Sequence, residues 1–195
     1  MNHFFWAHEI AALLGLNPYE TQKNLIYKKK SKINQDSPSL SPIMGNLPPL
    51  QSISGNQISD EIVTIDQLKS YIIHKYSDKM NHKILKDRQV TQQHKTYDNL
   101  YATVDGICIS NNGEKKLIKM NYKKKYKYND ISSKKLATHQ LIELLVIMEC
   151  FDVDSIDYVR YRYDFVDVLT IKRNKKWFQK GNVANIINNL SFSLS

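Results

Sequence analysis

The chain has 195 residues, of which 42% are hydrophobic, enough to form one ordinary core, and its length gives no reason to expect a second domain. Two cysteines, Cys108 and Cys150, exclude a disulfide framework, and without clustered histidines they do not suggest a zinc site. The longest apolar stretch, Leu141 to Phe151, contains two glutamates and is too short to cross a bilayer, and the N-terminus lacks the basic start of a secretion signal. We therefore expect a single domain over residues 1–195 that is soluble, intracellular and not bound to a membrane.

The net charge of +9 is unevenly distributed along the chain. Residues 1–105 contain 12 Lys and Arg against 10 Asp and Glu, whereas residues 106–195 contain 16 against 9. Most of the excess lies between Gly113 and Lys135, with nine lysines against Glu114 and Asp130. Such a block favours binding of a polyanion, with a solvated lysine-rich loop as the alternative.

The N-terminal third predicts two helices and a loop. Apolar residues in His8–Gly15 fall on one helical face, and Gly15 supplies the left-handed stop. Pro18 can occupy the first position of a second helix that runs to about Lys30. Residues 31–56 are rich in Pro and Ser and lack a periodic pattern, which indicates a loop.

The middle of the chain combines a long helix with a hairpin. Residues 58–76 carry an apolar stripe at helical spacing. Strands over Leu100–Thr103 and Ile107–Ser110 flank Asp105, and Asn111-Asn112-Gly113 predicts a hairpin turn into a strand over Lys115–Met120. Asp105 and Lys119 should then lie on neighbouring strands.

The last third predicts a helix, two strands and a final helix. A cap at Ser132 or Ser133 would start a helix that ends near Cys150. Its inner face would carry Ala137, Gln140, Leu141, Leu144 and Met148. Strands over 156–163 and 165–171 follow, then a helix after Trp177 and Phe178. This order predicts an α/β fold with a mixed central sheet flanked by helices.

Two segments resemble a known family. The ungapped run Glu9-Ile10-Ala11-Ala12-Leu13-Leu14-Gly15-Leu16-Asn17-Pro18-Tyr19 resembles the N-terminal signature of YqaJ-type viral recombinases, relatives of phage lambda exonuclease within the PD-(D/E)XK nuclease superfamily. Val104-Asp105-Gly106-Ile107, residues 113–122 and the helix containing Gln140 are similar to the versions encoded by large DNA viruses. The resemblance implies a restriction-endonuclease-like fold, and it covers most of the chain outside residues 31–99.

The family hydrolyses DNA phosphodiesters with metal-bound water, and magnesium prefers the carboxylate oxygens that such sites supply. By resemblance, Asp105 is a metal ligand and Gln140 supports the site from its edge. The central strand departs from the family pattern, because Lys119 stands where the family has a ligand Glu and Asn121 where it has a Lys. Glu61 or Asp60, one or two positions out of register, is the weak candidate for a further ligand.

A lysine at a ligand position replaces attraction for Mg²⁺ by repulsion worth several kcal/mol at low effective dielectric. We therefore expect Lys119 to pair with Asp105 and the metal site to be lost or greatly weakened. The alternative is a shifted motif in which Glu114 and Lys116 reach the site through a shortened hairpin.

The basic segment after the hairpin interleaves lysines with tyrosines, which suits phosphates and exposed bases; an ordinary solvated loop is the other reading. The candidate DNA-binding residues are Lys123, Lys124, Lys125, Tyr126 and Lys127.

The sequence supports one leading function and two alternatives. The leading interpretation is a virus-encoded nuclease homologue, in host cytoplasm or virion, that binds linear duplex DNA or its ends but is catalytically impaired or inactive. One alternative is an active Mg²⁺-dependent DNA exonuclease with displaced ligands. The other is a structural or assembly subunit that uses the nuclease fold, and homo-oligomers are compatible with each.

Overall fold

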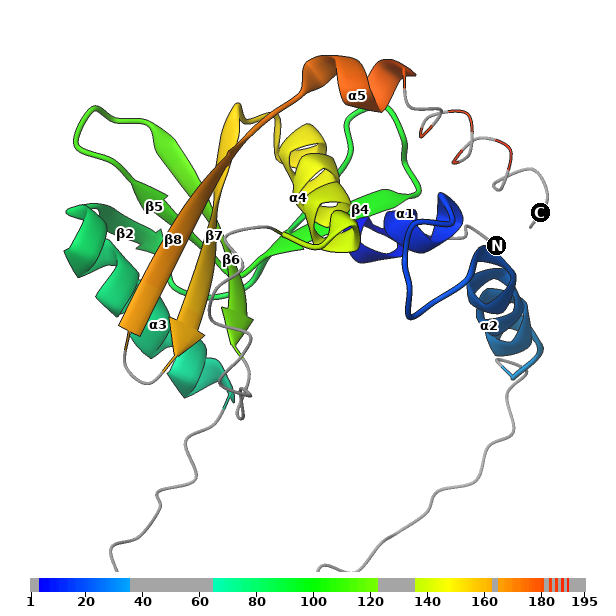
Figure 1. The fold of residues 1–195 in the computed structure, drawn as a ribbon, viewed down its shortest axis with the longest axis horizontal. Helices are drawn as coiled ribbons and strands as arrows, with labels where there is room; N and C mark the ends of the chain where they lie inside the picture. The colour runs from blue at the N-terminus through cyan, green and yellow to red at the C-terminus, as the bar shows by residue number, and fades with distance from the viewer. Residues whose placement is uncertain are drawn as a thin grey trace, which may run out of the picture.

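The structure is a computed structural model that describes residues 4–35, 65–122, 136–162 and 165–180, together with residues 183, 185, 187 and 189 (Figure 1). The elements, in chain order, are β1 (Phe5–Trp6), α1 (Ala7–Leu13), α2 (Gln22–Gln35), α3 (Ile65–Met80), β2 (Lys83–Lys86), β3 (Val90–Gln93), β4 (Leu100–Val104), β5 (Gly106–Ile109), β6 (Lys115–Tyr122), α4 (Thr138–Phe151), β7 (Ser155–Arg162), β8 (Phe165–Lys172) and α5 (Lys175–Lys180).

The described strands form a three-stranded and a five-stranded sheet, which meet between β4 and β5. The smaller sheet has the order β1-β4-β3, and the larger has the order β2-β5-β6-β7-β8. In the larger sheet β6 and β7 run parallel, whereas the other neighbours are antiparallel. Parallel neighbours require a crossover connection, and α4 lies in the connection between these two strands. The sheet is therefore mixed, as the sequence predicts.

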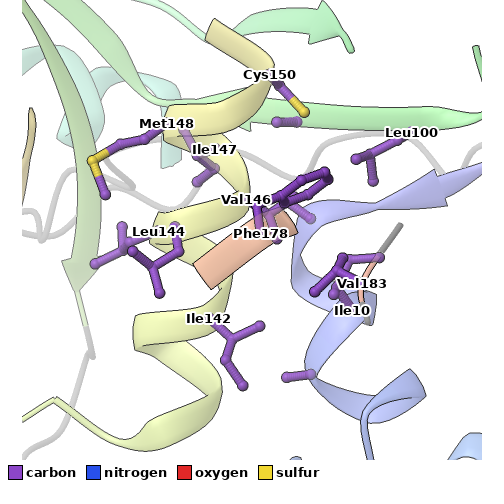
Figure 2. Packing of buried hydrophobic residues seen from close by; sticks show 14 of the residues in the cluster. Ile10, Leu100, Ile142, Leu144, Val146, Ile147, Met148, Cys150, Phe178 and Val183 are labelled. Atoms are coloured by element: carbon purple, nitrogen blue, oxygen red, sulfur yellow. The ribbon is translucent and has the colours of Figure 1, made fainter. Parts of the chain in front are cut away.

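Helices cover both faces of the larger sheet, because its central strands are apolar on both sides. Leu117 and Ile156 pack with α4 and α1, whereas Ile118 and Val159 pack with α3. Figure 1 shows α3 and α4 on opposite sides of the sheet, with α1 and α2 beyond α4. Figure 2 shows the α4 side, where Ile142, Val146 and Ile147 project from α4 on the side of Ile10, Leu100 and Phe178, whereas Leu144 and Met148 project from the opposite side of the helix.

The predicted hairpin and the two strands after α4 are confirmed. Asp105 separates β4 from β5, and the turn before β6 places Gly113 at φ +82°. The first helix is confirmed as well, with Gly15 at φ +70° beyond its end. Strands β1, β2 and β3 are not predicted from the sequence, since each has only two to four residues.

Several predicted boundaries are wrong. The second helix begins at Gln22 rather than Pro18, because the Thr21 hydroxyl accepts the Asn24 N–H and caps it there. It continues to Gln35, so the expected loop over 31–56 starts within a helix; residues 36–64 lie outside the described residues. Helix α4 begins at Thr138, and Leu141, expected on its inner face, is exposed.

Within the ranges described, no helix is long and apolar enough to cross a bilayer.

Candidate functional site

Asp105 lies where the chain leaves the smaller sheet and enters the larger one. Its side chain is buried, and its backbone N–H donates to the Ile118 carbonyl at 2.8 Å. The carboxylate Oδ2 accepts the backbone N–H of Met120 at 2.9 Å. The main chain of β6 therefore fixes the orientation of this carboxylate from within the junction of the two sheets.

Lys69 supplies the positive charge that balances Asp105. Its Nζ lies 2.9 Å from Asp105 Oδ1, and the two side chains are 14% and 6% exposed. Lys69 shares the inner face of α3 with Ile72, Ile73 and Tyr76, three, four and seven residues further along the helix. Each of these two buried charges is stabilised by the other, because a buried charge without a partner of opposite sign is strongly destabilising.

Lys119 pairs with Glu143 of α4, so the expectation that Lys119 pairs with Asp105 is wrong. The Lys119 Nζ lies 3.0 Å from Glu143 Oε1 and also donates to the Thr103 carbonyl at 3.3 Å. The predicted register is nevertheless correct, because Gly106 pairs with Ile118 and brings Asp105 beside Lys119 in the ladder. The partners differ because Lys119 extends toward α4, whereas the Asp105 carboxylate contacts the β6 main chain and α3.

Asn121 and Gln140 complete the group of four residues predicted from the sequence. The Asn121 Nδ2 donates to the Tyr158 hydroxyl at 2.7 Å. The Gln140 Oε1 accepts the Ala137 N–H at 3.2 Å and so caps the start of α4. Gln140 and Glu143 are three residues apart and share a helix face. The structure thus places Lys119 against the Gln140–Glu143 face of α4, whereas the Asp105 carboxylate is directed to α3 and the main chain of β6.

The shifted motif of Glu114 and Lys116 does not reach Asp105. The two residues form an ion pair at 2.9 Å beside the hairpin turn, where the Ser110 N–H donates to the Glu114 carbonyl. Asp105 lies at the opposite end of β5, five residues before Ser110, which corresponds to roughly 17 Å along a strand. The hairpin is not shortened, so this alternative is contradicted.

Two groups of predicted site residues cannot be placed. Glu61, the weak candidate ligand, lies outside the described residues, and so do the candidate DNA-binding residues Lys123, Lys124, Lys125, Tyr126 and Lys127.

The described donors do not fit a magnesium centre. In the part of the chain that the structure describes, no three His, Cys, Asp or Glu side chains are grouped closely enough to hold a metal ion. Asp105 and Glu143 are each paired with an ammonium group, so a divalent cation would have to displace a lysine from each carboxylate in order to bind there. The arrangement consists of two neutralised ion pairs, Lys69–Asp105 and Lys119–Glu143, which together are called the charge cluster.

A second buried cluster attaches α3, and therefore Lys69, to the larger sheet. Asp157 of β7 accepts hydrogen bonds from the Tyr76 hydroxyl of α3 and, at 2.6 Å, from the Thr170 hydroxyl of β8. Burial raises the pKa of Tyr76, and the neighbouring Asp157 carboxylate raises it further. Burial likewise raises the pKa of the adjacent Cys108 thiol to about 11. Both Tyr76 and Cys108 are therefore neutral at physiological pH.

Sequence reasoning missed Lys69 and Glu143, although each leaves a signal. Lys69 is a cation on the apolar stripe of a predicted helix, and Glu143 interrupts an apolar run three residues after Gln140. Charged residues on buried faces are rare unless they are paired. Each could therefore have been proposed as the partner of an opposite charge in the core.

No family model matches the sequence, and no curated protein matches it. Solved structures, in contrast, match the fold of the chain. An alkaline exonuclease (LHK-Exo) from Laribacter hongkongensis aligns over 98% of this chain and 89% of its own, with a TM-score of 0.69 and 13% identity. A structure of LHK-Exo in complex with dAMP aligns over the same shares, with a TM-score of 0.68 and 14% identity. The chain therefore has the α/β fold of this exonuclease, a restriction-endonuclease-like mixed central sheet flanked by helices.

Proposed function

We propose that this chain is a DNA-binding protein that keeps the fold of an alkaline exonuclease and has lost most or all phosphodiester hydrolysis. The proposal is supported by two ion pairs at the site, one between Lys69 and Asp105 and one between Lys119 and Glu143. They occupy the carboxylates that a hydrolytic metal would need. The similarity of Glu9–Tyr19 to viral recombinases supports a virus-encoded origin.

The proposed ligand is linear duplex DNA or its ends. The fold is shared with the exonuclease LHK-Exo, one structure of which is a complex with dAMP, and the net charge of +9 favours a polyanion. Phosphate contacts release counterions from DNA, so the affinity should fall steeply with salt, with a log–log slope of about −0.9 for each phosphate contacted.

The test combines a hydrolysis assay with a binding assay. The purified chain and an Asp105→Ala variant are incubated with end-labelled linear duplex DNA and Mg²⁺, and an EDTA arm is the blank. We expect no shortening of the DNA by either protein and a salt-dependent rise in fluorescence anisotropy on binding. Degradation that the substitution abolishes would establish the active exonuclease instead. Absence of binding at low salt would favour the assembly subunit.

A further inference from the structure

A cleft that the Asp105 site does not use lies between α2 and the β1–α1 segment. Its volume is about 540 Å³, within the range of pockets that take small organic ligands. The polar and aromatic side chains that line it are Trp6, His8, Glu9, Lys28, Lys29 and Ser31.

One wall of the cleft presents the Trp6 ring to solvent. Trp6 is 36% exposed, and Phe4, which neighbours the cleft in sequence but does not line it, is 47% exposed. Both rings contact Tyr101, at centroid distances of 5.7 Å for Trp6 and 5.2 Å for Phe4. The parallel pairing of β1 with β4 sets Trp6 beside Tyr101, so the rings are held in place before any ligand arrives. Such a surface can stack planar groups at low cost in side-chain entropy.

The opposite wall is formed by α2 and contributes two lysines, Lys28 and Lys29, each of which is paired with a glutamate. Helix α2 contains five lysines and no carboxylate. The Lys29 side chain is held against the β1–α1 segment, because its Nζ pairs with Glu9 at 2.9 Å and donates to the Phe4 carbonyl at 2.6 Å. Lys28 pairs with Glu20 and remains 63% exposed. Residues 4–35 contain five Lys against two Glu, so this region keeps an excess of positive charge.

An exposed tryptophan across a cleft from a lysine-rich helix suits one ligand chemistry in particular. Bases can stack on exposed rings while the phosphates between them meet the cations. The bases of a duplex are already stacked within the helix, so only an unpaired strand presents its faces. An acidic peptide would satisfy the lysines of α2 but would not use the exposed rings.

We propose that this cleft, between Trp6 and α2, binds a single-stranded segment of nucleic acid. The bases stack on Trp6, and the phosphates lie along the lysines of α2. The inference rests on the proposed DNA-binding function and adds a surface for an unpaired strand that is separate from the charge cluster at Asp105.

The first measurement leaves the cleft unaltered. Trp6 and Trp177 are the two tryptophans of the chain, so a Trp177→Phe variant makes Trp6 the single reporter. We expect oligo(dT) of about 20 nucleotides to quench the Trp6 emission, with weaker binding at higher salt. Poly-glutamate at equal charge concentration should leave the emission unchanged, and blunt duplex DNA serves as the second comparison.

Matched substitutions then test each wall. Trp6→Leu should weaken oligo(dT) binding by about tenfold, the effect of losing one stacked base, and Trp6→Phe should restore most of it. Phe165→Leu is the control, because Phe165 is exposed on β8 and does not line the cleft. Lys28→Gln should reduce the salt slope by about 0.7, whereas Lys175→Gln, in an exposed ion pair on α5, should not.

The outcomes separate this inference from the proposed function. Blunt duplex binding together with an unchanged Trp6 emission in oligo(dT) overturns the cleft proposal alone. Quenching by poly-glutamate but not by oligo(dT) also overturns it, in favour of an acidic protein partner. Failure to bind either form of DNA overturns the proposed function, and the cleft proposal with it.

Discussion

Asp105 has two partners, the main chain of β6 and the ammonium group of Lys69. The backbone N–H of Met120 fixes one carboxylate oxygen, and Lys69 fixes the other. A buried pair of this kind contributes little net stability compared with an apolar replacement, yet loss of one member leaves a charge without compensation. Stability should therefore depend on whether the two residues are changed singly or together.

The first prediction concerns this pair. Lys69→Met should lower the free energy of unfolding by about 3 kcal/mol, because it leaves the Asp105 carboxylate buried without a cation. The double variant Lys69→Met/Asp105→Asn should be more stable than Lys69→Met alone. Urea denaturation followed by circular dichroism measures both.

Lys175 provides the matched control. It pairs with Asp154 at 3.0 Å, but the two side chains are 67% and 79% exposed. Exposed pairs contribute little, so Lys175→Met should change the free energy of unfolding by less than about 0.5 kcal/mol. A loss in Lys69→Met no larger than in this control would show that the Lys69–Asp105 pair is not coupled to folding.

Individual site residues were predictable to different degrees. The hairpin turn and the strand periodicity predicted correctly that Asp105 and Lys119 are neighbours. The choice of partner was not predictable from them, because Lys69 and Glu143 come from helices distant in sequence. Which of two nearby cations reaches a carboxylate depends on the packing of those helices against the sheet.

At the scale of elements, α3 approaches β5 more closely than a side chain on β5 would allow. A Cβ built on Gly106 would lie 2.6 Å from Ile73 Cδ1 and 3.0 Å from the Lys86 carbonyl oxygen. Gly106 follows Asp105 directly, so the same contact positions Lys69 over the carboxylate. A glycine in a strand interior often marks such a close approach.

The second prediction tests this contact. Gly106→Ala should lower the free energy of unfolding by about 2 kcal/mol through overpacking against α3. Ile73→Val removes the Cδ1 atom that clashes and by itself should cost about 1 kcal/mol. The double variant should lose less than the two single losses together, as measured by thermal or urea unfolding. Strict additivity would mean that Ile73 does not limit the space at Gly106.

The elements that the sequence failed to predict share a physical feature. Strands β1, β2 and β3 are short and lie at sheet edges, where pairing with a neighbour rather than a run of apolar residues defines the strand. Helices α1 and α3 and strands β4 to β8 were predicted because each carries an apolar stripe at its own period. Pairing between distant segments leaves no comparable periodic signal.

At the scale of the whole molecule, the fold and the site behave as separable properties. The chain aligns over 98% of its length with LHK-Exo at 13% identity, so most side chains differ while the arrangement of elements is retained. The core consists of apolar faces on both sides of the larger sheet, and the ion pairs lie at its margin. Changes confined to the charge cluster should therefore alter ion binding and leave the architecture intact.

The third prediction is that the site can be made to bind a divalent cation while the fold is kept. In the double variant Lys69→Ala/Lys119→Glu, both ammonium groups are removed and a third carboxylate is introduced at position 119, which contacts Glu143 and neighbours Asp105 on the adjacent strand. In EDTA its unfolding midpoint should fall below that of the native chain, because three like charges repel one another. Millimolar Mn²⁺ should raise the midpoint again, since a ligand that binds the folded state alone stabilises it. Differential scanning fluorimetry measures both shifts.

The control for this experiment is Lys69→Ala/Lys119→Gln, which removes the same ammonium groups without adding a carboxylate. Mn²⁺ should stabilise it much less than the Glu variant, because two carboxylates provide fewer oxygen ligands than three. The native chain should show equal midpoints in Mn²⁺ and EDTA, since its carboxylates are already paired. A native midpoint that rises with Mn²⁺, and fails to rise once Asp105→Asn is introduced, would show that Asp105 binds metal despite Lys69.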